Sequence, residues 1–272
     1  NGLSKICDEI THMKPSMIEY DMQTKNMLIE EYTFKISPIP IVDEFSIVRE
    51  TLINAVKKRL LSDRPIGCLL SGGLDSSLIV SILCKMYPHR RVKTYSIGME
   101  GSADLKFARK VADYLGTCHT EVHFTPEEGI GAIPNVIRDL ASYDITTIRA
   151  SVPMWLLCKY ISKNTEDVVL LSGEGSDELF CGYLYFHYYP SLLQLEYESE
   201  RLVKNLYLYD VLRADRCVSS HGLELRVPFL DRDMIDLALS IRGACKAPTA
   251  GYEKYLLRKA FEDDYLPDDV LW

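Results

Sequence analysis

The chain has 272 residues, of which 47% are hydrophobic and 26% are charged, and its formal net charge is −8. This composition is ordinary for a globular protein, and the acidic balance argues against a nucleic-acid or membrane-surface partner. No apolar run approaches the ~20 residues that span a bilayer, and no signal peptide opens the chain. The eight cysteines form no C-x-x-C pair, which disfavours zinc and disulfides and favours a reducing, cytoplasmic compartment.

The N-terminal residues differ in sequence pattern from the rest of the chain. Residues 27–34 have the apolar and aromatic character of a strand. A linker is predicted around Pro38 and Pro40, since proline lacks an N–H and restricts the residue before it. A helix is predicted next, because these apolar residues recur at spacings of three and four: Phe45, Val48, Leu52, Val56 and Leu60.

Strands and helices alternate beyond residue 66. Strand character is found at residues 66–70, 92–98, 121–124 and 167–171. Helical patterns lie between them, including one at 104–115 that Gly116 would cap at its C-terminus. We therefore predict an α/β fold, a doubly wound and mostly parallel sheet with helices on both faces. In such a sheet the ligand binds beyond the carboxyl ends of the strands.

Other segments have less regular patterns. Residues 143–149 are predicted to form a polar loop ahead of a helix that begins near Ser151. Residues 196–217 have the pattern of one helix, and 221–231 that of a dense turn. Further helices are predicted at residues 233–239 and 253–261.

The turn after the first of these strands is the most informative stretch. Residues 71–77 (SGGLDSS) join that strand to an apolar-periodic helix, an arrangement that presents backbone N–H groups and a positive helix end to a phosphate. The two glycines permit a tight turn, and Ser71 and Ser76 add hydroxyl groups. Asp75 puts a carboxylate beside the phosphates, which indicates a bridging divalent cation. The Gly-Lys ending of a Walker loop is missing, which disfavours ordinary phosphoryl transfer.

A second turn of the same kind follows the strand at residues 167–171. Residues 172–178 (SGEGSDE) fail the dinucleotide fingerprint, because Glu178 occupies the position of its third glycine. Each turn contains Ser-Gly and has an aspartate, Asp75 or Asp177, just inside the next helix. Two carboxylates at neighbouring strand ends can share one Mg²⁺ with a polyphosphate. The alternative is that each carboxylate complements a helix dipole.

The motifs, in their order and spacing, are similar to those of one enzyme family. Residues 71–77 resemble the pyrophosphate loop of the N-type ATP pyrophosphatase superfamily, whose members cleave ATP to AMP and pyrophosphate while adenylating a substrate. Further motifs resemble the synthetase domain of glutamine-hydrolysing asparagine synthetases, especially the eukaryotic form: 143–150 (YDITTIRA), 171–179 (LSGEGSDEL), 182–187 (GYLYFH), 212–215 (LRAD) and 222–231 (GLELRVPFLD).

The resemblance implies a domain organisation. Residues 1–36 look like the tail of an N-terminal glutaminase domain, 37–42 like a linker, and 43–272 like the synthetase domain without its C-terminal part. The family's glutaminase uses an N-terminal cysteine. Since this chain begins at Asn1, we expect no glutamine hydrolysis from it alone. A homodimer is a further expectation.

The resemblance also implies a reaction, the amidation of L-aspartate to L-asparagine with ATP and Mg²⁺. The intermediate would be β-aspartyl-AMP, and the ammonia would come from glutamine in the intact enzyme. Residues that match the family's nucleotide site are Leu69, Ser71, Gly72, Gly73, Asp75, Ser76, Ile97, Ser172 and Gly173. Asp75 and Asp177 match its Mg²⁺ ligands. Taken alone, Leu69 and Ile97 would be ordinary core residues.

Five residues match the family's reacting groups. Glu174, between two glycines, is implied to be the base or organiser for ammonia attack, which requires a proton to leave nitrogen. Lys254 would stabilise charge on the leaving pyrophosphate. Arg149, whose planar fork suits oxyanions, would approach the phosphates with Thr146 and Thr147. The alternatives are a surface lysine at 254 and a structural ion pair at 149.

Two other functions stay open at this point. A β-lactam-forming synthetase of the same fold uses the same adenylation but closes a ring within its substrate. A non-catalytic interaction subunit could retain the fold without the chemistry. Such a subunit should have lost some of the charged residues of the site, and all five are present: Asp75, Arg149, Glu174, Asp177 and Lys254.

Overall fold

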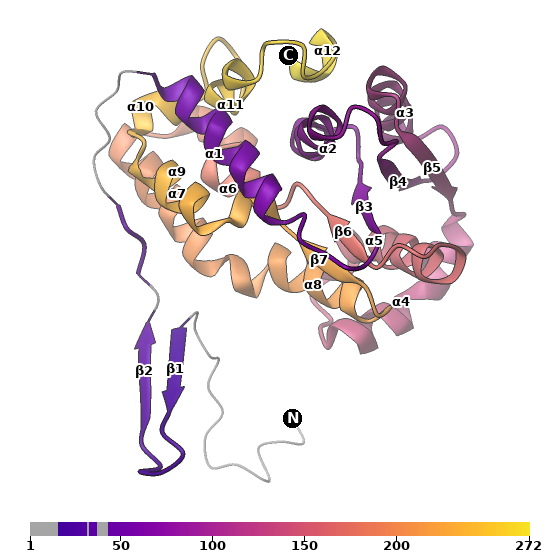
Figure 1. Ribbon diagram of the computed structural model, residues 1–272, viewed down its shortest axis with the longest axis horizontal. Coiled ribbons are helices and arrows are strands. Elements are labelled where there is room, and N and C mark those ends of the chain that lie inside the picture. Colours follow the sequence, from indigo (N-terminus) through magenta and orange to yellow (C-terminus); the bar gives the residue numbers. More distant parts are fainter. Residues whose placement is uncertain (1–15, 32, 37–42) are drawn as a thin grey trace. The chain divides into compact units, whose positions relative to one another are not determined.

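The structure, a computed structural model, describes residues 16–31, 33–36 and 43–272. The contacts divide the chain into two units, Asn1–Lys35 and Ile36–Trp272. In the first unit, β1 (Ser16–Tyr20) and β2 (Met27–Glu31) form an antiparallel hairpin (Figure 1). Strand β2 confirms the predicted strand as far as residue 31, whereas β1 was not predicted. The predicted linker at 37–42 lies outside the described residues.

The second unit is built on a five-stranded parallel sheet with the order β5-β4-β3-β6-β7. Its strands are β3 (Ile66–Leu69), β4 (Lys93–Gly98), β5 (Cys118–His123), β6 (Val169–Leu171) and β7 (Glu224–Arg226). The chain builds outward from β3 through β4 to β5 and then crosses to β6 on the other side. The order therefore reverses between β3 and β6, and ligand crevices form at such a reversal.

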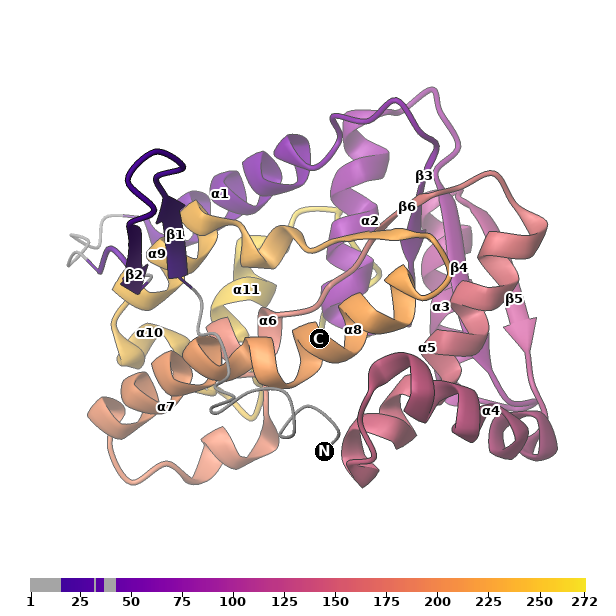
Figure 2. The ribbon, with the colours of Figure 1, turned by 90° about the horizontal axis from the view of Figure 1, so that it is seen from below.

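Helices cover both faces of this sheet, which confirms the predicted doubly wound α/β fold (Figures 1 and 2). On one face lie α2 (Leu74–Met86) and α3 (Ala103–Leu115), the latter ending at Gly116 with a φ of +66°. On the other lie α4 (Pro126–Leu140), α5 (Ile145–Asn164) and α8 (Asp210–Ser219). Right-handed crossovers explain this division, because the chain moves in opposite directions along the sheet on either side of β3.

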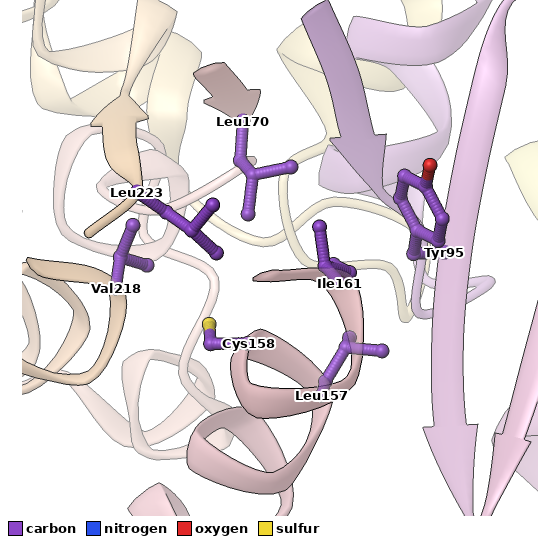
Figure 3. Close-up of a cluster of buried hydrophobic side chains, with 7 residues drawn as sticks. All are labelled: Tyr95, Leu157, Cys158, Ile161, Leu170, Val218 and Leu223. Carbon is purple, nitrogen blue, oxygen red and sulfur yellow. The ribbon is translucent and has the colours of Figure 1, made fainter. Parts of the chain in front are cut away.

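The core beneath the sheet joins strands to α5 and α8. Its buried members are Tyr95, Leu157, Cys158, Ile161, Leu170, Val218 and Leu223 (Figure 3). Each fully buried aliphatic side chain of this size contributes about 1.5–3 kcal/mol. This cluster fixes α5 and α8 against β4 and β6, so side chains at the ends of these elements have defined positions.

The rest of the second unit is helical and lies beside the sheet. Helix α1 (Glu44–Lys58) confirms the predicted first helix and packs on α9 (Arg232–Ser240) and α11 (Tyr255–Ala260). Asp43 caps α1 by accepting the Ser46 N–H at 3.1 Å. The other helical segments are α6 (Ser176–Leu179), η2 (Leu184–Tyr188), α7 (Leu192–Asn205), η3 (Leu206–Leu208), η4 (Pro228–Leu230), α10 (Gly243–Lys246) and α12 (Asp268–Leu271).

The structure corrects three predictions from local sequence. The predicted loop at 143–149 is wrong, because Asp144 accepts the Thr147 N–H at 2.8 Å and starts α5 at Ile145. The predicted single helix over 196–217 is interrupted at Tyr209, whose φ of −121° and ψ of −109° are not helical. The predicted turn at 221–231 contains the short strand β7.

Within residues 16–31, 33–36 and 43–272, none of the helices has the length and apolar character required to cross a bilayer.

Candidate active site

The first glycine-rich turn leads from β3 into α2. Ser76 Oγ accepts the Ser71 N–H at 3.1 Å and lies 2.9 Å from Ser71 Oγ, and Ser71 Oγ accepts the Gly73 N–H at 3.3 Å. These contacts hold the turn closed on itself. Gly73 begins α2 without a side-chain cap. The first N–H groups of a helix have no partner within the helix, so this end attracts an anion.

The second turn leads from β6 into α6 and touches the first one. A Cβ added to Gly173 would lie 2.6 Å from Ser76 N and 2.8 Å from the carbonyl carbon of Asp75. Only glycine therefore permits this approach of the two backbones. Gly175, with a φ of +94°, completes the turn. Glu174 stands between these glycines and lines a cavity, where its carboxylate faces Arg213 of α8.

The two turns line one cavity of about 480 Å³. Strand β4 adds Tyr95, Ser96 and Ile97 to the wall, and α5 adds Ala150, Pro153, Met154 and Leu157. The cavity lies at the carboxyl ends of β3, β4 and β6, where the strand order reverses. This position agrees with the expectation from the fold, and the wall combines apolar residues of β4 and α5 with charged residues of the two turns and α8.

Lys254 joins the aspartates of the two turns. Its Nζ lies 2.6 Å from Asp75 Oδ2 and 2.8 Å from Asp177 Oδ1, and its side chain is only 8% exposed. Burial alone would lower the pKa of Lys254, but the two carboxylates raise it above the ordinary value. A Cβ at Gly182 would lie 2.0 Å from Lys254 Cε, so this neighbouring glycine leaves space for the lysine.

The same aspartates fit the Mg²⁺ that the sequence predicts. Asp75 Oδ1 is buried and has no hydrogen-bond partner among the described residues. Burial raises the pKa of Asp177, although Lys254 opposes this. No group of three or more His, Cys, Asp or Glu side chains arranged to hold a metal occurs in the described ranges. A magnesium ion would then take its other ligands from water and phosphate, which is its usual habit.

Glu174 is a carboxylic acid of the cavity with a strongly raised pKa. Its side chain is 23% exposed. Burial raises its pKa to about 7, with Arg213 opposing the rise and Asp210, Glu178 and Asp177 adding to it. A carboxylate with a pKa near neutrality can accept a proton and release it again. The electrostatics thus favour the role that the sequence suggested.

Among the charged and polar cavity residues that were not predicted as site residues, four bond to one another or to Glu174: Glu178, Tyr183, Asp210 and Arg213. Arg213 lies 3.4 Å from both carboxylate oxygens of Glu174 and 3.0 Å from Asp210 Oδ1. Tyr183 Oη donates to Glu178 Oε1 at 2.5 Å. All four line the cavity. Glu178, Tyr183 and Arg213 lie in the motifs at 171–179, 182–187 and 212–215, for which no individual role of these residues was predicted.

The predicted nucleotide residues lie together. The cavity wall includes Leu69, Ser71, Gly73, Asp75, Ser76, Ile97, Ser172 and Gly173. Gly72 faces away, since a Cβ there would lie 2.4 Å from Ala108 N of α3.

The predicted phosphate-contacting residues of the 143–149 segment are not part of this wall. Thr146 and Arg149 are exposed and Thr147 is half-buried on the first turn of α5, immediately before the wall residue Ala150.

Comparisons with known proteins identify relatives of this chain. The sequence profile of the family described as asparagine synthase matches residues 47–201 and 191–272. Asparagine synthetase (glutamine-hydrolyzing) of Pongo abelii is 58% identical over 224 residues, which cover 80% of this chain and 40% of that protein. The Homo sapiens protein of the same description gives the same values. The chain thus spans about two fifths of the length of these curated relatives.

Solved structures give a more distant similarity. The glutamine-dependent NAD+ synthetase of Acinetobacter baumannii, in complex with ADP, aligns with a TM-score of 0.38 at 22% sequence identity. The alignment covers 61% of this chain and 31% of that one.

Proposed function

This chain belongs to the asparagine synthase family, and we propose on that premise that it catalyses the ATP-dependent amidation of L-aspartate to L-asparagine. The β-carboxylate of aspartate attacks the α-phosphorus of ATP, and the bond to pyrophosphate breaks to give β-aspartyl-AMP. Ammonia then attacks the acyl carbon, and AMP and a proton leave. In the intact enzyme the ammonia comes from glutamine.

One observation carries this proposal: the two glycine-rich turns touch at Gly173 and open into the same cavity. The first offers an uncapped helix end to an anion, and the second holds a carboxylate whose pKa is about 7. Adenylation requires a site for phosphates, and amidation requires a proton acceptor near the same carbonyl. A single cavity that contains both the helix end and the Glu174 carboxylate supports adenylation and amidation at the same bound intermediate.

The residues of the first turn and its neighbours would bind ATP. The start of α2 and the hydroxyls of Ser71 and Ser76 face the polyphosphate, while Leu69 and Ile97 contact the adenosine. Ser172 and the Gly173 backbone bound the adenosine from the side of β6.

Charged residues of the two turns, together with Lys254, would compensate the negative charge of the phosphates. Asp75 and Asp177 would hold Mg²⁺, which when bound supplies positive charge to the phosphate oxygens. Lys254, already between these carboxylates, would donate to the pyrophosphate as charge accumulates on it.

Glu174 would act in the second step. Attack by ammonia produces a positively charged nitrogen that must lose a proton, and an ionised carboxylate in the same cavity can accept it. Its pKa of about 7 leaves a substantial ionised fraction at neutral pH. Because burial causes this shift, the bound intermediate, which excludes more water, would make Glu174 a stronger proton acceptor.

Arg149, Thr146 and Thr147 are proposed to contact the phosphates and the acyl-adenylate. They precede Ala150 of the cavity wall on the same helix, and the exposed side chains of Thr146 and Arg149 have accessible hydrogen-bonding groups. This role requires the first turn of α5 to approach the nucleotide when it binds. Arg149→Lys, which keeps the charge but removes the bidentate fork, should weaken the adenylation step.

The test is pyrophosphate release by the protein expressed from its complete reading frame. Release should require ATP, Mg²⁺ and aspartate together, and the amino-acid product with ammonia should be asparagine. Absence of aspartate-dependent pyrophosphate release from the folded protein would overturn the proposal and favour an interaction subunit. Pyrophosphate release with a cyclised product, and no asparagine, would instead indicate a β-lactam-forming enzyme.

A further inference from the structure

Helix α8 adds a pair of opposite charges to the cavity wall. Asp210 and Arg213 are three residues apart and lie on the same side of the helix, and both line the cavity. Arg213 Nε and Nη2 lie 3.2 and 3.0 Å from Asp210 Oδ1. The Asp210 side chain is 42% exposed and that of Arg213 only 13%. The pair therefore presents an accessible carboxylate and a largely buried guanidinium to the same space.

The guanidinium is not tightly paired with the second turn. Its Nη2 lies 3.4 Å from both Glu174 oxygens, longer than the 2.7–2.9 Å of a strong charge-assisted bond. Its Nη1 meets the thioether sulfur of Met154 at 3.7 Å, and a thioether is a weak acceptor. Glu174 and Asp210 raise the pKa of Arg213 although burial opposes this, so the group stays charged. A carboxylate from a ligand would therefore be a stronger partner than the groups around Nη1.

The chemistry of the acceptor substrate matches this pair. If the β-carboxylate of aspartate approaches the phosphates at the first turn, its α-ammonium and α-carboxylate remain to be recognised. An ammonium requires acceptor oxygens, which Asp210 provides. An α-carboxylate requires a planar fork of donors, which Arg213 provides. A buried site built around such partners strongly rejects an analogue that lacks one of them.

We propose that Asp210 and Arg213 select the acceptor amino acid, with Asp210 binding its α-ammonium and Arg213 its α-carboxylate. This inference rests on the proposed function. The residues that determine specificity for aspartate then lie on α8, separate from the turn that binds the phosphates. The β-carboxylate then points toward the α2 N-terminus, and the acyl carbon comes to lie beside Glu174.

The experiment compares aspartate with two analogues that each lack one α-group. Succinate has no α-ammonium, and β-alanine has no α-carboxylate. Pyrophosphate release is measured with each acid, in the protein from its complete reading frame. The wild type should prefer aspartate over both. In Arg213→Met the preference over β-alanine should fall about 100-fold, and in Asp210→Asn the preference over succinate should fall by a similar factor.

Two matched controls isolate the effect. Arg138→Met and Asp113→Asn remove the same charges from exposed side chains, each 70% exposed, and should change neither preference. Arg213→Lys keeps the charge and should lose part of the preference over β-alanine while remaining folded. The KM for ATP should change less than threefold in all these variants, because the nucleotide turn is unaltered.

The outcomes distinguish this inference from the function on which it rests. If the wild type releases no pyrophosphate with aspartate, the proposed function fails. If the wild type is active but the variants lose kcat equally for aspartate, succinate and β-alanine, Arg213 and Asp210 only position Glu174 and the inference is overturned. Loss of preference for the matching analogue in each variant supports it.

Discussion

The two glycine-rich turns occupy equivalent positions at the ends of β3 and β6 and share a serine and an aspartate, yet they differ in the other groups that they present to the cavity. The first offers hydroxyls and the uncapped start of a 13-residue helix. The second offers carboxylates and leads into a helix of only four residues. A similar sequence pattern therefore serves two purposes. In the proposed reaction the first turn compensates negative charge, and the second supplies the proton acceptor.

The largest effect should come from the second turn. Glu174→Gln keeps the shape of the side chain but cannot accept a proton, so asparagine formation should fall about 100- to 10,000-fold. Pyrophosphate release in the first turnover should persist, because adenylation depends on the first turn. Asparagine quantified by chromatography and pyrophosphate by a coupled assay measure the two steps. Glu127→Gln, an exposed glutamate on α4, is the control. A normal asparagine yield from Glu174→Gln would contradict the division between the turns.

The next effect concerns the lysine that both turns share. Lys254→Met should slow pyrophosphate formation about 100- to 1,000-fold, as expected for loss of a donor to developing charge. It also leaves Asp75 and Asp177 without their shared partner, which should lower the free energy of unfolding by about 2 kcal/mol.

The control for this change is Lys259→Met, which removes a surface pair with Glu262 and should leave the urea midpoint essentially unchanged. Rapid-quench kinetics and urea denaturation provide the measurements. Equal effects from the two lysines would show that Lys254 has no special role between the turns.

A smaller effect is expected from separating the turns without changing any charge. Gly173→Ala adds a Cβ that would lie 2.6 Å from Ser76 N, so one backbone must move. Overpacking of this kind costs about 1–3 kcal/mol. We expect a lower urea midpoint and a higher KM for ATP. The comparison variant is Gly131→Ala on α4, where a Cβ would meet nothing within 4 Å. If both variants have the same midpoint and KM, close contact between the turns is unnecessary.

The smallest effect is a pH dependence specific to the second turn. Because the pKa of Glu174 is about 7, its proton-accepting form is depleted below that pH, and asparagine formation should fall toward acidic pH. Pyrophosphate release in the first turnover should not show this decrease toward acidic pH. A decrease common to both steps, with the same midpoint, would assign the titration to another group.

The same shift affects stability with a definite sign. Between pH 4.5 and about 7 the folded protein retains a proton on Glu174 that the unfolded chain has released. This group therefore makes the free energy of unfolding decrease as pH rises through that interval. Urea denaturation of Glu174→Gln over the same interval should show a flatter dependence. An unchanged slope would mean that the Glu174 pKa is not raised in the folded state.

Local sequence was sufficient for strands β3 to β6 and for both turns, because these depend on short-range patterns. The nucleotide residues were predicted from the family resemblance and stay a prediction. Local sequence was insufficient where a few contacts determine whether a segment is helix, strand or loop. Asp144 extends α5 back through a segment that looked like a polar loop, and β7 has only three residues. Arg213 was missed because its role depends on a neighbour 39 positions away, Glu174. The family resemblance found Lys254, whereas composition and periodicity gave no reason to choose it.

The ion pairs of Lys254 also connect distant parts of the chain. Lys254 and Asp75 are 179 positions apart, so this contact forms only after almost the whole second unit has been synthesised. Contacts of such long sequence separation form late, since they require the closure of large loops. During synthesis the two turns can fold against the sheet while their aspartates still repel each other. Docking of α11 places Lys254 between the two aspartates and removes that repulsion, so the charged part of the cavity reaches its final arrangement only through this late contact.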